Sequence, residues 1–395
     1  MSSFRSAQRA ARASAPLLRS SPAVTTRGSQ RLFHESSKAK AVEALATQTP
    51  RNGGPPPPPF LGHQQFQQQQ QQQQQLPTEP YPQVEGFTQL NVREQAYNPK
   101  FYETVGKIMK LREKYLRDRC IFVESDEMVE LMLGLGAKES DIPGMKTVSD
   151  KLYHDPTLPF RRTRNSRFCL DFDTHSIRRL EFQPFVLTVE EDFNRYDSGA
   201  IRRFDEVQND LQLNSVFQAL FAFKAMIIHG MEIAHRPKLE YGLNKWVCTL
   251  FNLRTVTTPH ILGEPALEGV HSDGVDHTMT TFLGSYNMSD NSAATFMHSM
   301  DEKTGIPLEE IQPKHLLARV QHKKFLDTLM IVDHERKHSL SAVYPVDKTK
   351  EAHRDMLVFF TRKPVDRSHV SGSIDSLTPH KELPMEIPLY LPGAN

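Results

Sequence analysis

The chain has 395 residues, of which 38% are hydrophobic and 24% are charged, and its formal net charge is +1. Residues 1–40 contain eight Lys and Arg and one acid, Glu35, so this segment carries +7 and the rest of the chain carries −6. A mildly acidic body without a basic stripe excludes the usual electrostatic basis for binding nucleic acid. No apolar run reaches the roughly 18 residues that a membrane-spanning helix needs.

The first segment, residues 1–40, is rich in Arg, Ser and Ala and almost free of acids. This composition is typical of a mitochondrial presequence, which forms a basic amphipathic helix during import. We therefore expect the mature protein in the mitochondrial matrix. A disordered basic tail or a nucleic-acid-binding arm is the alternative interpretation.

Residues 41–85 contain five consecutive prolines from Pro55 and a glutamine run that ends at Gln75. Both features favour extended or disordered conformations. We predict a disordered Pro/Gln-rich linker over residues 41–85 and a folded domain over residues 86–395. A ligand for a small proline-recognition domain is the alternative interpretation of the linker.

The first part of the folded domain is predicted to be mainly helical. Apolar residues recur at three- and four-residue intervals over residues 100–119, and residues 126–135 have a similar pattern. Residues 168–172 and 182–189 are predicted to be strands because they are rich in aromatic and β-branched side chains. Residues 214 to about 234 are apolar nearly all round, so this helix should pack against a sheet.

After Tyr241 the sequence changes to short β-prone stretches separated by turn residues. These predicted strands are residues 246–254, 277–283, 294–297, 329–332, 339–344 and 356–361. Helices gathered before many short strands indicate an α+β fold, in which a β-sandwich or jelly-roll barrel has a helical buttress.

A His-x-Asp pair, His271 and Asp273, lies just before the strand predicted at residues 277–283. On an extended strand residues i and i+2 project to the same face, so both side chains can point into a barrel. Two histidines and one carboxylate form a facial triad that leaves positions open on Fe(II). The pair alone is weak evidence, since about one such pair is expected by chance in a chain with 17 histidines.

A third ligand and an anion-binding residue follow further along the chain. His338 opens an alternating stretch over residues 338–344, and a barrel strand there would bring its imidazole beside the first two ligands. Arg354 lies sixteen residues later, before the strand predicted at 356–361. A fixed guanidinium can bind the distal carboxylate of a 2-oxo acid while the other end of that acid chelates the metal.

Three stretches, EGVHSDGVDH, DTLMIVDHERKHSLSAVYPV and HRDMLVFFTRKP, resemble the 2-oxoglutarate and Fe(II) dioxygenase family that includes bacterial free-amino-acid hydroxylases such as isoleucine 4-hydroxylase. The upstream stretch FVLTVEEDFNRYDSGAIRRF and the segment around Arg254 are also similar to that family. The resemblance covers roughly residues 182–363.

The resemblance implies a double-stranded β-helix (jelly-roll) barrel that holds Fe(II) through His271, Asp273 and His338. It also implies that Arg354 binds the carboxylate of the co-substrate 2-oxoglutarate, and that Arg254 and Asn287 line or support the pocket. The implied reaction is hydroxylation of a small substrate, such as a free amino acid, by dioxygen with release of succinate and CO2.

Some residues compete for these roles. His277, His298 and His334 are the other candidate histidines, Asp276 can replace Asp273 in another register, and Ser341 and Tyr344 can either bind 2-oxoglutarate or pack. Two other functions compete as well. A zinc-dependent hydrolase would use the same histidines, although no predicted helix carries an HExxH motif, and a catalytically silent jelly-roll barrel would only bind a partner or metabolite.

Overall fold

The structure is a computed structural model, and it describes Leu90, Val92 and residues 94–185, 201–369, 371–372 and 375–393. These residues fall within the unit Glu79–Asn395. The predicted presequence, the linker and the boundary at residue 86 lie outside the described residues and stay predictions. No described helix has the length and apolar character to cross a membrane.

Most helices come before the central strands along the chain. The α-helices are α3 (Pro99–Asp118), α4 (Ser125–Gly134), α5 (Ile142–Thr147), α6 (Asn209–Gln212) and α7 (Ser215–Ile228). The 3₁₀ helices are η1 (Glu94–Tyr97), η2 (Glu139–Asp141), η3 (Leu308–Glu310), η4 (Pro313–His315) and η5 (Asp333–Glu335). The helices predicted at residues 100–119 and 126–135 are confirmed as α3 and α4.

The strands are β1 (Cys120–Val123), β2 (Arg161–Asp171), β3 (Ser176–Leu180), β4 (Asp205–Glu206), β5 (Lys245–Thr257), β6 (His277–Tyr286), β7 (Thr295–His298), β8 (Leu316–Val320), β9 (Thr328–Val332), β10 (Lys337–Leu340), β11 (Ala352–Arg362) and β12 (Glu386–Pro388). Five of the six strands predicted after Tyr241 correspond to β5, β6, β7, β9 and β11. The sixth, predicted at residues 339–344, shares only residues 339–340 with β10. The sequence did not predict β1, β3, β4, β8 or β12.

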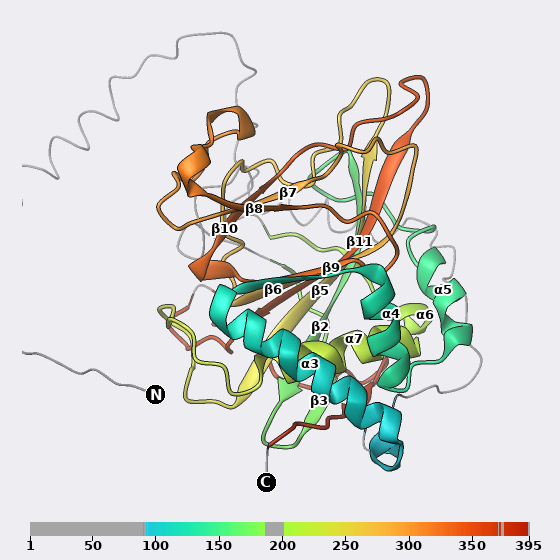
Figure 1. Cartoon of the computed structure of the whole chain (residues 1–395), viewed down its shortest axis with the longest axis vertical. Coiled ribbons are helices and arrows are strands. Elements are labelled where there is room, and N and C mark those ends of the chain that lie inside the picture. Colours follow the sequence, from blue (N-terminus) through green and yellow to red (C-terminus); the bar gives the residue numbers. More distant parts are fainter. Residues whose placement is uncertain are drawn as a thin grey trace, which may run out of the picture. The chain divides into compact units, whose positions relative to one another are not determined.

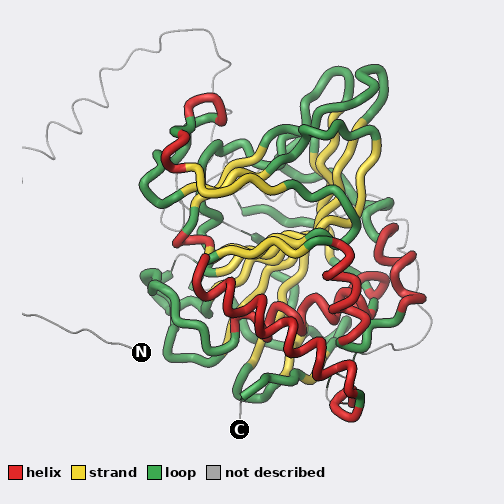
Figure 2. The backbone as a smooth tube through the Cα atoms, in the orientation of Figure 1, coloured by secondary structure: helices red, strands yellow, loops and turns green. Residues whose placement is uncertain are grey.

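Two sheets form the barrel. Within the described residues nine strands form the large sheet, in the order β1-β9-β6-β11-β5-β2-β3-β12 with β4 beside β2, and three strands form the small sheet, in the order β10-β7-β8. Figure 1 shows the small sheet on one side of the large sheet and helices α3, α4 and α7 on the other. Figure 2 shows the same three layers by type of element. The predicted α+β jelly-roll with a helical buttress is confirmed.

Strand β11 separates the helical layer from the barrel interior. Because side chains alternate along a strand, Phe359 and Phe360 point to opposite faces. Phe359 contacts Phe217 and Phe221 of α7, at ring-centroid distances of 6.2 and 5.1 Å. Phe360 and Arg354 line a pocket inside the barrel. The register of β11 therefore decides which of its side chains reach the site.

Helix α7 fixes the large sheet from behind, and each of its residues is buried. A helix that is buried all round must be apolar on every face, as the sequence predicted. Its one charged residue, Lys224, donates a hydrogen bond from Nζ to the Phe359 carbonyl at 2.9 Å. The predicted end near residue 234 is wrong. The helix stops at Ile228 because His229 leaves the helical region and Gly230 has φ +60°.

The prediction for strand β2 was too short, because it covered only residues 168–172. The strand begins at Arg161, and its polar first half is also largely buried. Buried acids compensate its arginines: Arg164 pairs with Asp210 at 2.8 Å. The alternation of apolar residues that identifies a half-buried strand is therefore missing there.

The strand predicted at residues 182–189 is not formed where it can be checked. Phe185 makes only an isolated bridge with Arg202, residues 182–184 lie outside any strand, and residues 186–189 lie outside the described residues. The three cysteines are free thiols, as expected from their spacing.

Candidate metal centre

The backbone places His271 and His338 side by side. They form an isolated antiparallel bridge in which each backbone amide donates to the carbonyl of the other, both at 2.8 Å. Asp273 lies two residues further on, in the loop before β6. The sequence predicted an extended strand at this pair, whereas the structure has a single bridge followed by a bend. The bridge joins two residues that are 67 positions apart in sequence.

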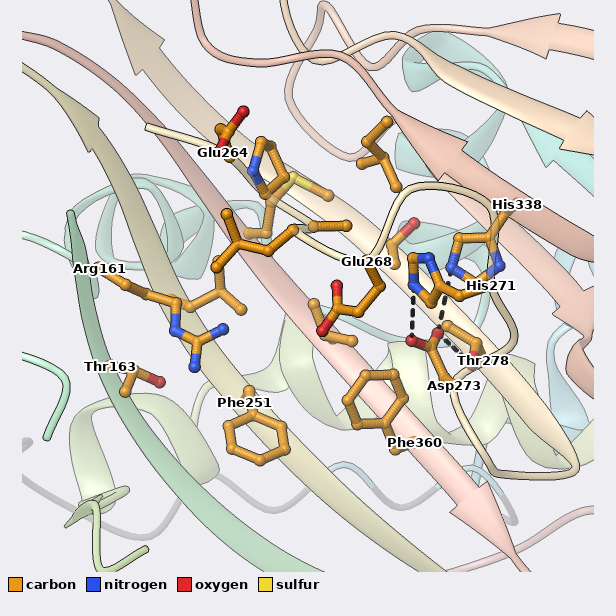
Figure 3. Close-up of a pocket in the computed structure, with 18 of the residues that line it drawn as sticks. Arg161, Thr163, Phe251, Glu264, Glu268, His271, Asp273, Thr278, His338 and Phe360 are labelled. Carbon is orange, nitrogen blue, oxygen red and sulfur yellow. Dashed lines mark hydrogen bonds and ion pairs between the residues drawn. The ribbon is translucent and has the colours of Figure 1, made fainter. Parts of the chain in front are cut away.

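The three side chains converge on one point (Figure 3). Nε2 of His271 lies 3.5 Å from Oδ1 of Asp273, and Nε2 of His338 lies 3.4 Å from Oδ2 of Asp273. One ligand atom from each residue lies within 4.8 Å of the others, and all three residues are buried. Two imidazoles and one carboxylate are the donor set of a facial triad for non-haem Fe(II). The residues present therefore fit an iron ion.

The imidazole of His271 is held in one orientation. Its Nδ1 lies 2.9 Å from the carbonyl oxygen of Gly269, and a carbonyl can only accept, so the proton is on Nδ1 and the Nε2 lone pair faces the centre. Gly269 has φ +67°, and a Cβ there would lie 2.2 Å from the Ile306 carbonyl oxygen. Only glycine satisfies both conditions at this position.

A second carboxylate, Asp333 of η5, lies behind the triad. It accepts a hydrogen bond from the Asp273 backbone amide, and its Oδ1 lies 3.7 Å from Nδ1 of His338. Outer carboxylates of this kind orient histidine ligands. Sequence reasoning missed Asp333, since nothing in its local pattern distinguishes it from other acids.

The electrostatic environment favours the ionised form of Asp273. Burial opposes ionisation, but the neighbouring imidazoles of His338 and His271 outweigh it, so the pKa of Asp273 is held well below its usual range. A carboxylate that is already deprotonated is ready to bind a cation.

The triad opens into a pocket with a volume of about 150 Å³. Its walls include the aliphatic residues Leu329, Ile331, Leu340, Met356 and Val358. Figure 3 shows the triad at one end, Glu268 and Phe360 beside it, and Arg161 and Glu264 further away. The pocket is thus mainly apolar, with a few polar groups that can orient a ligand.

Arg354, at the start of β11, also lines this pocket and is 4% exposed. Its Nη2 lies 3.4 Å from Nδ1 of His322, and no carboxylate of the described residues lies within 4.0 Å of its guanidinium. Burial lowers the pKa of Arg354 to about 10, so it is still a cation at neutral pH. Burial, and then the charge of Arg354, lower the pKa of His322 to about 3, which leaves this imidazole neutral.

A buried cation without an acidic partner is costly unless a ligand compensates its charge. Arg354 therefore fits the carboxylate of a 2-oxo acid bound in the same pocket as the triad. A structural ion pair would be another role for Arg354, but the described residues offer it no acidic partner, and its contact is with His322.

Arg254 and Asn287 support the strands and do not line the pocket. Arg254 lies on the opposite face of β5 and binds Asp355 at 2.6 and 2.8 Å. Asn287 follows β6 with φ +52°, and it exchanges two 2.8 Å hydrogen bonds with the backbone of Asp347. Both residues hold the ends of strands that carry pocket residues.

The competing residues have other partners. The contacts are Tyr115 for His277 (2.9 Å), Ser339 for His298 (2.8 Å), the Ala234 carbonyl for His334 (2.6 Å), Tyr241 for Asp276 (2.7 Å) and the Ala294 amide for Ser341 (3.0 Å), while Tyr344 is 38% exposed. None of these residues lines the pocket that contains the triad.

Comparisons with known proteins agree with this geometry. Residues 146–360 match the family model for 2OG-Fe dioxygenases. The bifunctional enzyme flvA of Aspergillus flavus is 46% identical over 302 residues, which are 76% of this chain and 37% of that protein. The chain therefore spans little more than a third of that relative's length.

Two solved structures are similar as well. The Fe(II)/alpha-ketoglutarate-dependent dioxygenase TqaL is 58% identical, with a TM-score of 0.66 over 75% of this chain and 99% of that chain. A bsmA homologue from Methylobium petroleophilum PM1 is 18% identical, with a TM-score of 0.51 over 64% of this chain and 93% of that chain, and this likeness shows the fold alone.

Proposed function

Because the chain belongs to the 2OG-Fe dioxygenase family, we propose that it is an Fe(II)- and 2-oxoglutarate-dependent oxygenase that hydroxylates a small substrate. The observation that carries this proposal is the pairing of two sites in one pocket. His271, Asp273 and His338 offer three metal ligands within 4.8 Å, and Arg354 offers a buried cation without an acidic partner among the described residues.

The chain's own residues have distinct tasks in this reaction. Nε2 of His271, Nε2 of His338 and the Asp273 carboxylate hold the metal. Arg354 binds the distal carboxylate of 2-oxoglutarate. The aliphatic wall of the pocket excludes water, which strengthens both electrostatic contacts. When bound, Fe(II) and 2-oxoglutarate supply the oxidation by dioxygen, with release of succinate and CO2.

For the substrate, the proposal is a free amino acid. Its support is the resemblance of residues 182–363 to a family that includes free-amino-acid hydroxylases. For localisation, the proposal is the mitochondrial matrix, and its support is the composition of residues 1–40.

Two measurements test the proposed function. Anaerobic addition of Fe(II) and 2-oxoglutarate should give a weak visible charge-transfer band, which neither a zinc hydrolase nor a silent binding barrel predicts. A screen of free amino acids and other small acids for succinate release then tests the substrate class. If no amino acid raises succinate release above the uncoupled background, the amino-acid proposal is wrong. The charge-transfer band would still decide whether the protein is an oxygenase.

A further inference from the structure

A second cavity lies on the other side of Asp273. Its volume is about 50 Å³, and we call it the Arg167 chamber. Three of its lining residues, Phe185, Asp273 and Phe360, also line the main pocket. The proposed carboxylate ligand of the metal therefore stands in the wall between the two cavities.

Strand register builds this chamber. Thr249 of β5 is paired with Arg167 of β2 on one side and with Phe360 of β11 on the other. Phe360 is in turn paired with Thr278 of β6, whose hydroxyl donates to Asp273 at 3.2 Å. The chamber and the metal centre thus lie at the same level of the large sheet, next to each other.

The chamber and Arg354 lie at opposite ends of one strand face. Arg354 and Arg362 belong to β11 and are separated by an even number of residues, so their side chains project from the same face. Arg354 lines the main pocket, and Arg362 lines the chamber near the end of the strand. A co-substrate bound to Arg354 would leave the groups of the chamber available to a second molecule.

The charges of the chamber favour an anion. Arg167 and Arg362 both pair with the single carboxylate of Asp375, the second at 3.1 Å, and the side chains of Arg167 and Asp375 are 8% and 7% exposed. Asp273 also lines the chamber, but its carboxylate belongs to the metal centre. Among the described residues that line the chamber, two guanidinium groups therefore share the one carboxylate that is not a proposed metal ligand.

Two neighbouring polar atoms lack hydrogen-bond partners among the described residues. They are the donor Nη1 of Arg167 and the acceptor Oδ1 of Asn165. Asn165 and Arg167 are two residues apart on β2, so both side chains project to the chamber. Leaving buried polar atoms without partners is unfavourable, and a ligand with an acceptor and a donor close together would satisfy both.

We propose that the Arg167 chamber binds the carboxylate of the organic substrate, with Nη1 of Arg167 donating to it and Oδ1 of Asn165 accepting from an adjacent ammonium group. The chemical class is an α-amino acid, anchored on the side of Asp273 that is remote from Arg354. This inference rests on the proposed function and names the part of the site that holds the substrate.

The test compares acids with their amides under anaerobic conditions. The probes are L-isoleucine, L-leucine, L-phenylalanine, L-lysine and L-glutamate, each beside its primary α-amide, which lacks the α-carboxylate charge. Each probe is titrated into the protein loaded with Fe(II) and 2-oxoglutarate, and its affinity is read from the change in the charge-transfer band. The same titrations are made by calorimetry on the metal-free protein, so that the chamber is tested even if the band does not form.

The variants are Arg167→Gln and Arg362→Gln. Arg178→Gln is the matched control, since Arg178 of β3 pairs with Asp171 of β2 at 2.6 Å and lines neither cavity. For the wild type and the control we expect at least one acid to bind about tenfold or more tightly than its amide. In both variants this preference should largely disappear while 2-oxoglutarate still binds. Thermal unfolding shows whether each variant folds, and Arg362→Gln, at 17% side-chain exposure, is the milder change.

Three outcomes overturn the inference: equal binding of acids and amides by the wild type, an acid preference that a folded variant retains, or no binding of any probe. Failure of the proposed function is a different result, because then Fe(II) and 2-oxoglutarate produce no band before any probe is added.

Discussion

The carboxylate of Asp333 accepts a hydrogen bond from the backbone amide of Asp273, and so fixes the loop that carries one proposed iron ligand. The same carboxylate lies 3.7 Å from Nδ1 of His338. Asp333→Ala should therefore weaken Fe(II) binding by about 10- to 100-fold. Competition with a chelator measures the affinity. Asp327→Asn is the control. Asp327 also accepts a hydrogen bond from a backbone amide, that of Ser125 at 2.8 Å, but it lines neither cavity. An equal loss of iron affinity in this control would refute a specific role for Asp333.

We expect His271→Ala, Asp273→Ala and His338→Ala each to abolish turnover and weaken iron retention without unfolding the protein, because each removes one of three metal ligands. His334→Ala should keep most of the activity, since its imidazole contacts the Ala234 carbonyl. Succinate release and bound iron are measured together. Equal loss in His334→Ala would show that the distal histidine has been assigned wrongly.

Arg354 should determine the affinity for 2-oxoglutarate and not for iron. Arg354→Lys keeps the charge but loses the planar fork, so more 2-oxoglutarate should be required while Fe(II) binding stays nearly unchanged. Arg354→Ala should cost about 2–5 kcal/mol, which is roughly a 30- to 5,000-fold weaker co-substrate. Titration of 2-oxoglutarate against the charge-transfer band measures both. A midpoint equal to that of the wild type would remove Arg354 from the site.

Stability should depend on pH through Lys224. Burial lowers its pKa from 10.5 to about 8 in the folded state. Between these values the unfolded chain binds more protons than the folded chain, so the free energy of unfolding should rise as the pH rises from about 8 to 10.5, by on the order of 3 kcal/mol. Below pH 8 the full penalty of the buried charge is present.

Lys224→Met removes this titration. The difference in unfolding free energy between the wild type and this variant should therefore change between pH 8 and 10.5. Lys314→Met, on an exposed residue of η4, is the control and should show no such change. Denaturant unfolding at several pH values measures both. A difference curve that is flat from pH 8 to 10.5 would contradict the buried, depressed lysine.

The mitochondrial address is tested by fusing residues 1–45 to a fluorescent reporter. We expect mitochondrial import, because the segment has the basic, acid-poor composition of a presequence. A variant with the arginines of residues 1–40 changed to glutamine is the control and should stay in the cytosol. A diffuse cytosolic signal from the unaltered segment rules out the proposal.

The ligand residues could be predicted from sequence because short segments carry them. His271 and Asp273 are two residues apart, and His338 opens an alternating stretch, so local pattern and family resemblance identify all three. The helices α3, α4 and α7 could be predicted for the same reason, since their periodicity is local. The end of α7 depended on the conformation of His229 and Gly230, and the apolar pattern continued past it.

The rest of the site depends on contacts between distant segments. Asp333 reaches Asp273 across 60 residues, and Arg167 reaches Asp375 across 208. The first half of β2 lacks the apolar alternation of a strand because it is rich in arginine. These arginines can be buried there only because acids from distant parts of the chain pair with them. Only the register of the large sheet shows that Arg167 and Phe360 lie at the same level.

The contact between Arg354 and His322 has a consequence for the lifetime of the protein. Because a neutral imidazole accompanies this cation, the described residues of the folded chain leave a buried charge uncompensated when no anionic ligand is bound. A co-substrate that binds only the folded chain raises the free energy of unfolding by about 2.7 kcal/mol at 100 times its Kd. A chain deprived of 2-oxoglutarate should therefore unfold and be degraded sooner than a saturated one. In the cell, the abundance of the protein would then rise and fall with the supply of this metabolite.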